Sequence, residues 1–392
     1  MRVALFTDTY LPEINGVVTS IEMVRKKLEE LGHEVYVICT CPGFLQVQFQ
    51  NRIIRIPGIE LKRLYGYIMV QPMHLFLQKE LKELHFDVIH CHSEFGVGIY
   101  GTHVAKRLHI PLVRTYHTTW EDYTHYANII HSRHLDVELK KAVSYLSRMY
   151  GNDCMRLIAP SPKTKELLLS YGITTPIDVI PTGVELKRYR KEPSDRMKKE
   201  VAEAYENDKQ EKIFLYVGRL AQEKSIDMLI KAFVKVKDAG LPARLVIIGD
   251  GPQKRDLQYL CLRNNVEDRA QFLGAIENRD IPAYYHQADC FLSASTSETQ
   301  GMTYIEALAS SLPVMGRRDE VIMDLIREGE NGFFFDDEEE LFEKIKEFLA
   351  MDETKIQEMK KTASVSVEQY DADVFAQKIL EVYRKAIEAY NK

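Results

Sequence analysis

The 392-residue sequence lacks the features that mark membrane-spanning and disulfide-rich proteins. No apolar run reaches the ~18 residues that cross a bilayer, and tryptophan occurs only once. The six cysteines are scattered, without the spacing of a zinc site or a disulfide framework. We therefore expect a reducing cytoplasm and a first strand, not a signal peptide, at the N-terminus. The length predicts two domains.

The sequence also lacks a strong excess of charge of either sign, with a formal net charge of −6. Residues 1–180 hold 20 Lys+Arg against 18 Asp+Glu, and the remainder holds 32 against 40. Eleven of the twelve histidines lie in the first part. Neither part is basic enough to predict nucleic acid as a partner.

Short apolar runs alternate with amphipathic segments through the first half of the chain. This alternation predicts a mostly parallel sheet with helices on both faces. The predicted strands are Val3–Thr7, Glu34–Thr40, Ile53–Ile56, Asp87–His90, Leu112–Thr115, Arg156–Ala159 and Asp178–Ile180. The predicted helices are Gly16–Leu31, Pro72–Leu84, Val97–Leu108, Leu135–Tyr150 and Pro162–Tyr171.

The same alternation starts again after Arg190, so we predict a second doubly wound α/β domain joined near residues 181–190. Ser225 is predicted to cap one of its helices. The chain ends in an amphipathic helix, Val374–Tyr390, whose pattern does not say which domain it packs on. The predicted strands of this half are Ile213–Val217, Arg244–Ile248, Ala270–Leu273, Cys290–Ser293 and Pro313–Met315.

Two carboxylates eight residues apart flank the predicted start of a helix. Glu298 would lie in a polar loop, and Glu306 about one turn inside the helix. Backbone N–H groups of a first helical turn, here at Gly301, Met302 and Thr303, attract phosphate. Carboxylates on either side can accept hydrogen bonds from sugar hydroxyls, so this element predicts a nucleotide-sugar site.

Two loops that follow predicted strands could complete this site. Arg219 and Lys224 flank a turn that opens a helix, where two cations can hold a pyrophosphate and stabilise its charge as it leaves. A surface loop with solvated charges is the alternative, disfavoured because the element with Glu298 and Glu306 occurs in the same half of the chain. Gly249 would allow a base or ribose to approach closely, although an ordinary tight turn explains it equally well.

In the first half, Gly16 would let a phosphate or sugar approach a helix N-terminus. No complete Gly-x-Gly-x-x-Gly is present, so a dinucleotide fingerprint is excluded. His117 follows the strand Leu112–Thr115 within a polar, aromatic loop, and a structural and a functional role are both open for it.

Two apparent metal motifs are set aside. His90 and His92 have a spacing compatible with metal binding, but Cys91 lies between them and no carboxylate motif completes a site. Asp371 and Asp373 precede the last helix, where Asp is a common cap. We therefore expect no metal.

With these motifs the chain resembles the retaining glycosyltransferases of the GT-B fold, family 4, over nearly its whole length. Ser311 departs from the pattern, because the family usually has glycine there; we expect a subtle effect on the turn. The segments that carry the resemblance are Asp8-Thr9-Tyr10-Leu11-Pro12 with Ile14-Asn15-Gly16-Val17, Gly218-Arg219-Leu220 with Glu223-Lys224, and Glu298-x7-Glu306 with Ala307-Leu308 and Leu312-Pro313-Val314.

The resemblance implies two Rossmann-like domains facing a cleft. Residues 1–185 would bind the acceptor, with the C-terminal helix 373–392 crossing back onto them, and residues 186–372 would bind a nucleotide sugar. The family usually works without metal, and the nucleotide sugar is a substrate, so no cofactor is expected. The implied contacts are Arg219 and Lys224 with the diphosphate, Glu306 with the ribose, Glu298 with the donor sugar, Gly16 with the phosphate side and His117 with the transferred sugar.

The stretch from Thr115 to Tyr126 looks most like the bacterial diacylglycerol glucosyltransferases. This likeness implies UDP-glucose as donor, a membrane lipid such as diacylglycerol as acceptor, and peripheral contact with an anionic membrane at the inner face of the cell membrane. Leu61–Val70 and Trp120 would rest in a headgroup interface or, more simply, line the core or the cleft. Transfer to a soluble or cell-wall glycan and a non-catalytic nucleotide-sugar binder remain as alternatives.

Overall fold

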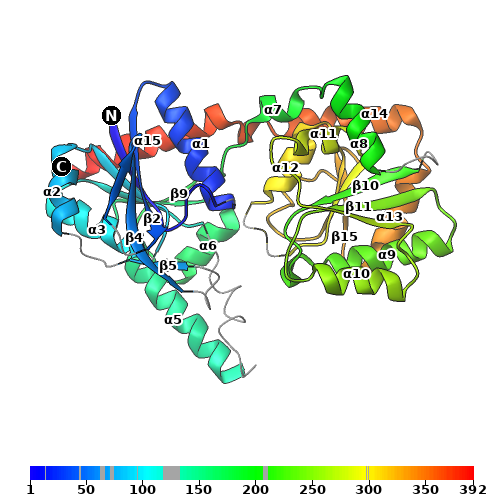
Figure 1. Cartoon of the computed structure of the whole chain (residues 1–392), viewed down its shortest axis with the longest axis horizontal. Helices are drawn as coiled ribbons and strands as arrows, with labels where there is room; N and C mark the ends of the chain where they lie inside the picture. Colours follow the sequence, from blue (N-terminus) through cyan, green and yellow to red (C-terminus); the bar gives the residue numbers. More distant parts are fainter. Residues whose placement is uncertain are drawn as a thin grey trace. The chain divides into compact units, whose positions relative to one another are not determined.

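The computed structural model describes residues 1–13, 15–43, 46–61, 67–70, 75–94, 96–117, 133–205, 211–296, 298 and 300–392. The chain forms two compact units (Figure 1). Unit 1 consists of Met1–Gly183 together with Ala372–Lys392, and unit 2 is Val184–Asp371. Each unit is built around its own sheet.

The sheet of unit 1 runs in the order β3-β4-β2-β1-β6-β7-β8-β9, with β5 paired to β4. Its neighbouring strands are parallel except for the pairs β3–β4 and β4–β5. All seven predicted strands are present, whereas β3 and β5 were not predicted. The strands are β1 (Arg2–Phe6), β2 (Glu34–Pro42), β3 (Gln48–Gln50), β4 (Ile53–Leu61), β5 (Tyr67–Met69), β6 (Val88–Cys91), β7 (Leu112–Thr115), β8 (Arg156–Ala159) and β9 (Ile177–Val179).

Helices cover this sheet on both faces, because each carries an apolar stripe that must be buried. The final helix packs with α1 against the sheet through Phe375, Ile379 and Tyr383. Lys27 on α1 also pairs with Asp373, 2.7 Å away. The helices of unit 1 are α1 (Gly16–Glu30), α2 (Leu75–Glu83), α3 (Gly96–Leu108), α5 (Arg133–Gly151), α6 (Pro162–Ser170) and α15 (Ala372–Tyr390).

The sheet of unit 2 is entirely parallel, in the order β12-β11-β10-β13-β14-β15. Two doubly wound parallel sheets confirm the predicted α/β fold class. All five predicted strands are present, and β15 was not predicted. The strands are β10 (Lys212–Val217), β11 (Ala243–Ile248), β12 (Ala270–Gly274), β13 (Cys290–Ser293), β14 (Val314–Arg317) and β15 (Gly332–Phe335).

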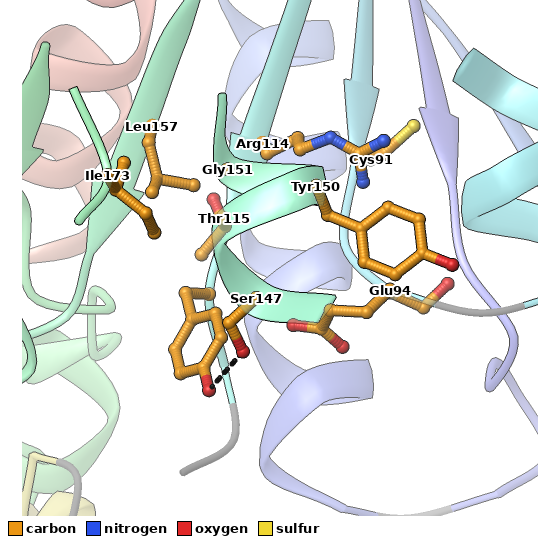
Figure 2. A pocket seen from close by; sticks show the side chains of 11 residues that line it. Cys91, Glu94, Arg114, Thr115, Ser147, Tyr150, Gly151, Leu157 and Ile173 are labelled. Carbon is orange, nitrogen blue, oxygen red and sulfur yellow. Dashed lines mark hydrogen bonds between the residues drawn. The ribbon is translucent and has the colours of Figure 1, made fainter. Parts of the chain in front are cut away.

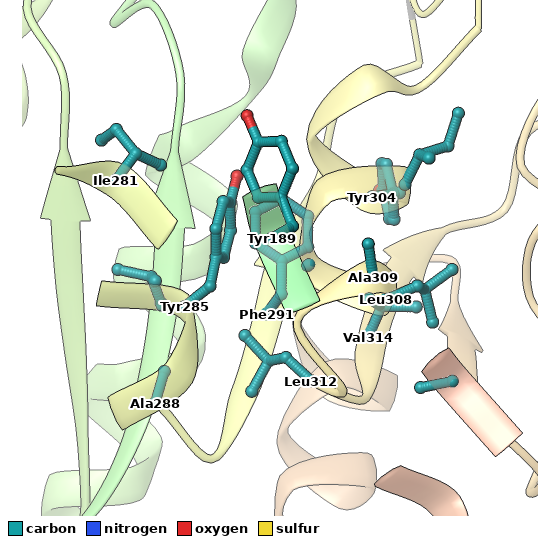
Figure 3. Packing of buried hydrophobic residues seen from close by; sticks show 14 of the residues in the cluster. Tyr189, Ile281, Tyr285, Ala288, Phe291, Tyr304, Leu308, Ala309, Leu312 and Val314 are labelled. Atoms are coloured by element: carbon teal, nitrogen blue, oxygen red, sulfur yellow. The ribbon is translucent and has the colours of Figure 1, made fainter. Parts of the chain in front are cut away.

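Two apolar clusters fill the two faces of this sheet. One lies beneath α9, α10 and α13. The other lies beneath α7, α8, α11, α12 and α14, where Phe291 of β13 contacts the rings of Tyr285 and Tyr304 edge-on (Figure 3). The helices are α7 (Leu186–Arg190), α8 (Asp195–Tyr205), α9 (Ile226–Asp238), α10 (Lys254–Arg263), α11 (Ile281–Gln287), α12 (Met302–Ala309), α13 (Glu338–Leu349) and α14 (Glu353–Ser366).

Ser225 occupies the predicted N-cap position, but the prediction that its side chain caps the helix is wrong. Ser225 directly precedes α9, but it has a φ of +48° and its side chain makes no capping hydrogen bond. A short 3₁₀ turn, Gln222–Lys224, ends immediately before Ser225, whose backbone lies in the left-handed region. A serine before an apolar stripe is the usual signature of a cap, and the sequence does not reveal the left-handed backbone that prevents it here.

Ser311 sits in a backbone conformation that favours glycine, with a φ of +59° just after the end of α12. Left-handed backbone costs a non-glycine residue about 1–2 kcal/mol, partly offset by the greater freedom of glycine in the unfolded chain. We expect Ser311→Gly to raise the free energy of unfolding by about 1 kcal/mol, measured by urea titration with circular dichroism.

The matched control is Gly240→Ser, which places serine where φ is +65° and where an added Cβ meets nothing within 4 Å. Because only backbone strain changes, this variant should lose stability by a similar amount. A Ser311→Gly protein no more stable than the original would contradict the assignment of strain to Ser311.

Candidate active site

Two loops of unit 2, which follow β10 and β11, pack backbone against backbone. A Cβ on Gly249 would lie 1.8 Å from the carbonyl oxygen of Gly218, and one on Gly251 would lie 2.4 Å from that of Leu220. The Leu220 N–H also donates to the Asp250 carbonyl at 2.9 Å. This contact is sufficient reason for glycine at position 249, and it holds the loop that carries Arg219, whose side chain is exposed.

The structure pairs Lys224 with Glu298, which the sequence analysis assigned to different parts of one ligand. Lys224 follows β10 and Glu298 follows β13, and these two strands are neighbours in the sheet. The Lys224 Nζ lies 2.7 Å from the Glu298 Oε1 and 3.4 Å from the Ser295 hydroxyl. Both charged side chains keep part of their surface exposed, 23% and 15% respectively.

The helix α12 begins after Glu298 with a residue that cannot cap it. Gly301 occupies the N-cap position with a φ of +74° and has no side chain to accept from the first-turn N–H groups. Met302 and Thr303 form the first turn and are partly exposed. Backbone donors at such a helix start are the groups that bind phosphate in many proteins. Ser297 and Thr299, on either side of Glu298, lie outside the described residues.

Glu306 projects from the same helix toward two tyrosines that the sequence analysis missed. The Tyr285 hydroxyl lies 3.1 Å from a carboxylate oxygen of Glu306, and Tyr189 is also hydrogen-bonded to this carboxylate. Burial raises the pKa of Glu306, while the two hydroxyls and Arg188 act to lower it. The rings of Tyr189 and Tyr285 lie side by side with their hydroxyls at the same end (Figure 3).

In unit 1, His117 belongs to a cluster of three histidines. Its Nε2 lies 2.9 Å from the Nδ1 of His92, and the two rings are stacked. The ring of His90 lies 4.0 Å from that of His92, centroid to centroid. Both nitrogens of His90 have hydroxyl partners at 2.7 Å, Tyr383 of α15 and Thr115 of β7.

Burial keeps all three imidazoles neutral. It lowers the pKa of His90 to about 3 and that of His117 to about 4, and it holds the pKa of His92 well below 6.5. Within the residues that the structure describes, no group of three or more His, Cys, Asp or Glu side chains is arranged to hold a metal ion.

Gly16 is the first residue of α1 and is exposed. An added Cβ would meet nothing within 4 Å, so packing inside unit 1 does not require glycine at this position. The preceding Asn15 caps the helix, because its side chain accepts from the Val18 N–H at 3.0 Å. Asp8, in the same matching segment, accepts from the Val97 N–H at 2.6 Å and so caps α3.

Unit 1 also contains a small pocket, at the ends of β6 and β7, that the sequence did not predict (Figure 2). Arg114, only 4% exposed, lines it together with Glu94 and Tyr150. The Arg114 guanidinium donates to Thr102 and lies 5.5 Å from the centre of the Tyr150 ring. Tyr116 and Ser147 also line the pocket, and their hydroxyl oxygens lie 3.4 Å apart.

Most of the residues predicted to face a membrane lie outside the described part of the chain. Trp120 and residues 62–66 lie outside the described residues, as do the side chains of residues 60–69. Among the helices that are described, none is long and apolar enough to span a membrane.

Comparisons with known proteins agree with this architecture. Residues 197–365 match the family model "Glycosyl transferases group 1", and residues 14–188 match "Glycosyltransferase Family 4". The α-monoglucosyldiacylglycerol synthase of Acholeplasma laidlawii is 36% identical over 399 residues, covering all of this chain and 99% of that protein. The synthase of the same name from Streptococcus pneumoniae is 33% identical, covering all of this chain and 87% of that protein.

Among solved structures, HepE of Anabaena in complex with UDP aligns with a TM-score of 0.75 at 16% identity, over 98% of this chain and 100% of that one. The fold is therefore that of the GT-B glycosyltransferases. Full-length identity above 30% narrows this class: the chain belongs to glycosyltransferase family 4 and is a hexosyltransferase.

The buried histidines make stability depend on pH. A histidine whose pKa is lowered by folding binds protons more strongly in the unfolded chain, so acid favours unfolding. We expect the free energy of unfolding to fall between about pH 6.5 and pH 4, by up to about 1.4 kcal/mol per pH unit for each such imidazole. Urea titrations at pH 7 and pH 5 measure this.

His103, which is exposed on α3, supplies the control. His103→Asn should leave the pH dependence unchanged, whereas His90→Phe should reduce it. Equal unfolding free energies at the two pH values would contradict the burial of neutral imidazoles.

Proposed function

We propose that this enzyme transfers glucose from UDP-glucose to a lipid hydroxyl, with diacylglycerol as the acceptor, and retains the anomeric configuration. Two relatives that match the whole chain at 36% and 33% identity carry the name α-monoglucosyldiacylglycerol synthase. The observation that carries the donor site is the Lys224–Glu298 pair, next in sequence to the start of α12, where Gly301 provides no capping side chain. A cation, a carboxylate and a helix N-terminus at one place match a sugar bonded to a diphosphate.

In the proposed complex the donor replaces the internal ion pair. The diphosphate binds the cationic side chains of Lys224 and Arg219. It also accepts hydrogen bonds from the backbone N–H groups at the start of α12, those of Gly301, Met302 and Thr303. Glu298 is then released to accept from hydroxyls of the donor sugar. Glu306 accepts from the ribose, and the Tyr189 and Tyr285 hydroxyls hold its carboxylate in place. The nucleoside lies against the loop of Gly249, where the Gly218 backbone already requires glycine.

The chemistry follows from where charge develops. The bond between the sugar C1 and the phosphate oxygen breaks, and UDP leaves with the electron pair. The acceptor oxygen attacks C1 on the same face, and its proton passes to a phosphate oxygen of UDP. Arg219, Lys224 and the helix N–H groups stabilise the negative charge as it forms, which is the kind of fixed electrostatic support that accelerates such steps most.

Unit 1 contributes the acceptor side in this proposal. His117 contacts the transferred sugar, and Gly16 lets the phosphate side of the donor approach α1. An exposed glycine with open space around it suits that role. Tyr145 and Met149 on α5 are 65% and 47% exposed and share the helix with Arg148, which favours peripheral contact with an anionic membrane.

We expect purified protein to transfer radioactive glucose from UDP-glucose to diacylglycerol in liposomes that contain anionic lipid. Labelled glycolipid is measured by thin-layer chromatography, beside UDP release as an independent readout. GDP release from GDP-mannose, or UDP release from other UDP-sugars, without any UDP release from UDP-glucose would overturn the choice of donor.

Flotation with the same liposomes distinguishes the acceptor classes. Protein that floats only with anionic lipid supports the membrane acceptor, whereas protein that stays at the bottom of the gradient favours a soluble or cell-wall glycan. The control for the exposed face of α5 is Tyr145→Ser with Met149→Ser, which should weaken flotation without reducing UDP-glucose binding.

Removing either donor-site cation should slow the reaction strongly. We expect Lys224→Met and Arg219→Met to lower kcat/KM for UDP-glucose by about 10²–10³-fold, the usual cost of deleting one group that stabilises developing charge. The matched control is Lys231→Met on α9, whose cation pairs with Asp227 at 2.8 Å on the surface and should matter little.

Isothermal titration with UDP separates binding from catalysis in these variants. A non-catalytic nucleotide-sugar binder would bind the donor without releasing UDP and would be indifferent to Glu298→Gln in any turnover assay. Loss of turnover in Glu298→Gln, with the fold intact by circular dichroism, excludes that alternative.

A further inference from the structure

We propose that His92 is a positioning residue that holds His117 in one orientation and one tautomer, with the proton of His117 on Nδ1. This inference rests on the proposed function only where it concerns rate, because the tautomer itself can be measured without substrate. The feature behind it is the short contact between the two imidazoles, 2.9 Å from the His92 Nδ1 to the His117 Nε2.

Two neutral imidazoles can share a hydrogen bond in only two ways, since one nitrogen must donate and the other must accept. Either His92 donates from Nδ1 and His117 accepts at Nε2, or the roles are reversed. Burial lowers the pKa of both rings, so a hydrogen bond in which one of the two is a charged imidazolium is disfavoured. The choice between the two arrangements therefore fixes which nitrogen of His117 carries its proton.

The second nitrogen of His92 decides the choice. His92 is 3% exposed, and its Nε2 has no hydrogen-bond partner among the described residues. A buried N–H without a partner is rarer in proteins than a buried acceptor without one. His92 is thus expected to keep Nε2 unprotonated and to carry its proton on Nδ1. His117 then accepts at Nε2, and its own Nδ1 becomes an N–H donor.

The neighbouring ring prevents His92 from turning over. His90 packs against His92 with the ring centres 4.0 Å apart. His90 is itself held at both nitrogens, by the Tyr383 hydroxyl and the Thr115 hydroxyl. Tyr383 comes from α15, so the last helix of the chain fixes the ring stack that orients His117. A donor at a fixed place, without positive charge, suits a contact with a sugar oxygen.

Nitrogen-15 NMR of the histidine rings tests the tautomer in the unliganded protein at pH 7. The His117 signals are assigned by their loss in His117→Gln. We expect a protonated Nδ1 and an unprotonated Nε2, with shifts near the two extremes. In His92→Leu, the two His117 nitrogens should move toward averaged values because the tautomers exchange. A proton on Nε2 of His117 in the original protein would overturn the proposal.

Turnover tests the consequence for the reaction. We expect His92→Leu to lower kcat by about 10–100-fold, as loss of orientation of a reacting group does, with a smaller change in KM for UDP-glucose. In His92→Asn the side-chain amide occupies the place of Nδ1, can donate to His117, and should recover most of the rate. A core residue without a positioning role would show no such recovery once stability is matched.

The outcomes separate this inference from the proposed function. If His117→Gln leaves kcat unchanged, the role of His117 in transfer is wrong, while the NMR result still decides the tautomer. If His117→Gln is slow but His92→Leu is fast, His92 does not position it. Should His92→Leu fail to fold, Tyr383→Phe frees one nitrogen of His90 and should loosen the same stack, seen as broadened or averaged His117 signals.

Discussion

The proposed donor site depends on the pairing of two adjacent parallel strands, because β10 and β13 bring a cation and a carboxylate to the same edge of the sheet. Without a ligand, Lys224 and Glu298 neutralise each other at 2.7 Å. Leaving either one alone in a partly buried place would be costly. A ligand that carries both negative phosphate and hydroxyl donors can replace both halves of the contact at once, which a simple anion cannot do.

Much of the fold was predictable, because buried parallel strands are continuous apolar runs. Two of the three missed strands have specific causes: β3 is a three-residue, exposed segment with glutamine at both ends, and β5 is equally short. The place of α15 could not be predicted from its pattern, because an amphipathic stripe indicates that a helix is buried but not what it packs against; only the family resemblance implied that it returns to the first domain. Only the packing of Phe375, Ile379 and Tyr383 with α1 decides it.

The charged part of the candidate site could be proposed from sequence, because its residues follow predicted strands or lie near the start of a predicted helix: Arg219, Lys224, Glu298 and Glu306. The residues that contact these charged groups could not be identified from the sequence. Tyr189 and Tyr285 look like core residues in short helices, and they are core residues that also present hydroxyls to Glu306. His92 alternates with His90 along β6, a pattern that suggests metal binding, and only the position of His117 reveals its contact. Glycine at position 249 has a structural explanation that the sequence did not show, because the Gly218 backbone leaves no space for a side chain there.

The residues assigned to the proposed site carry different charges in the two units, and the proposed reaction gives a reason. UDP leaves with negative charge, and unit 2 presents exposed or half-exposed cations that can meet it. The sugar carbon becomes positive as its bond breaks, so a cation near it would oppose the reaction. Burial lowers the pKa of His117 to about 4, which keeps its imidazole neutral at physiological pH. A neutral N–H donor can orient a sugar oxygen without adding charge beside that carbon.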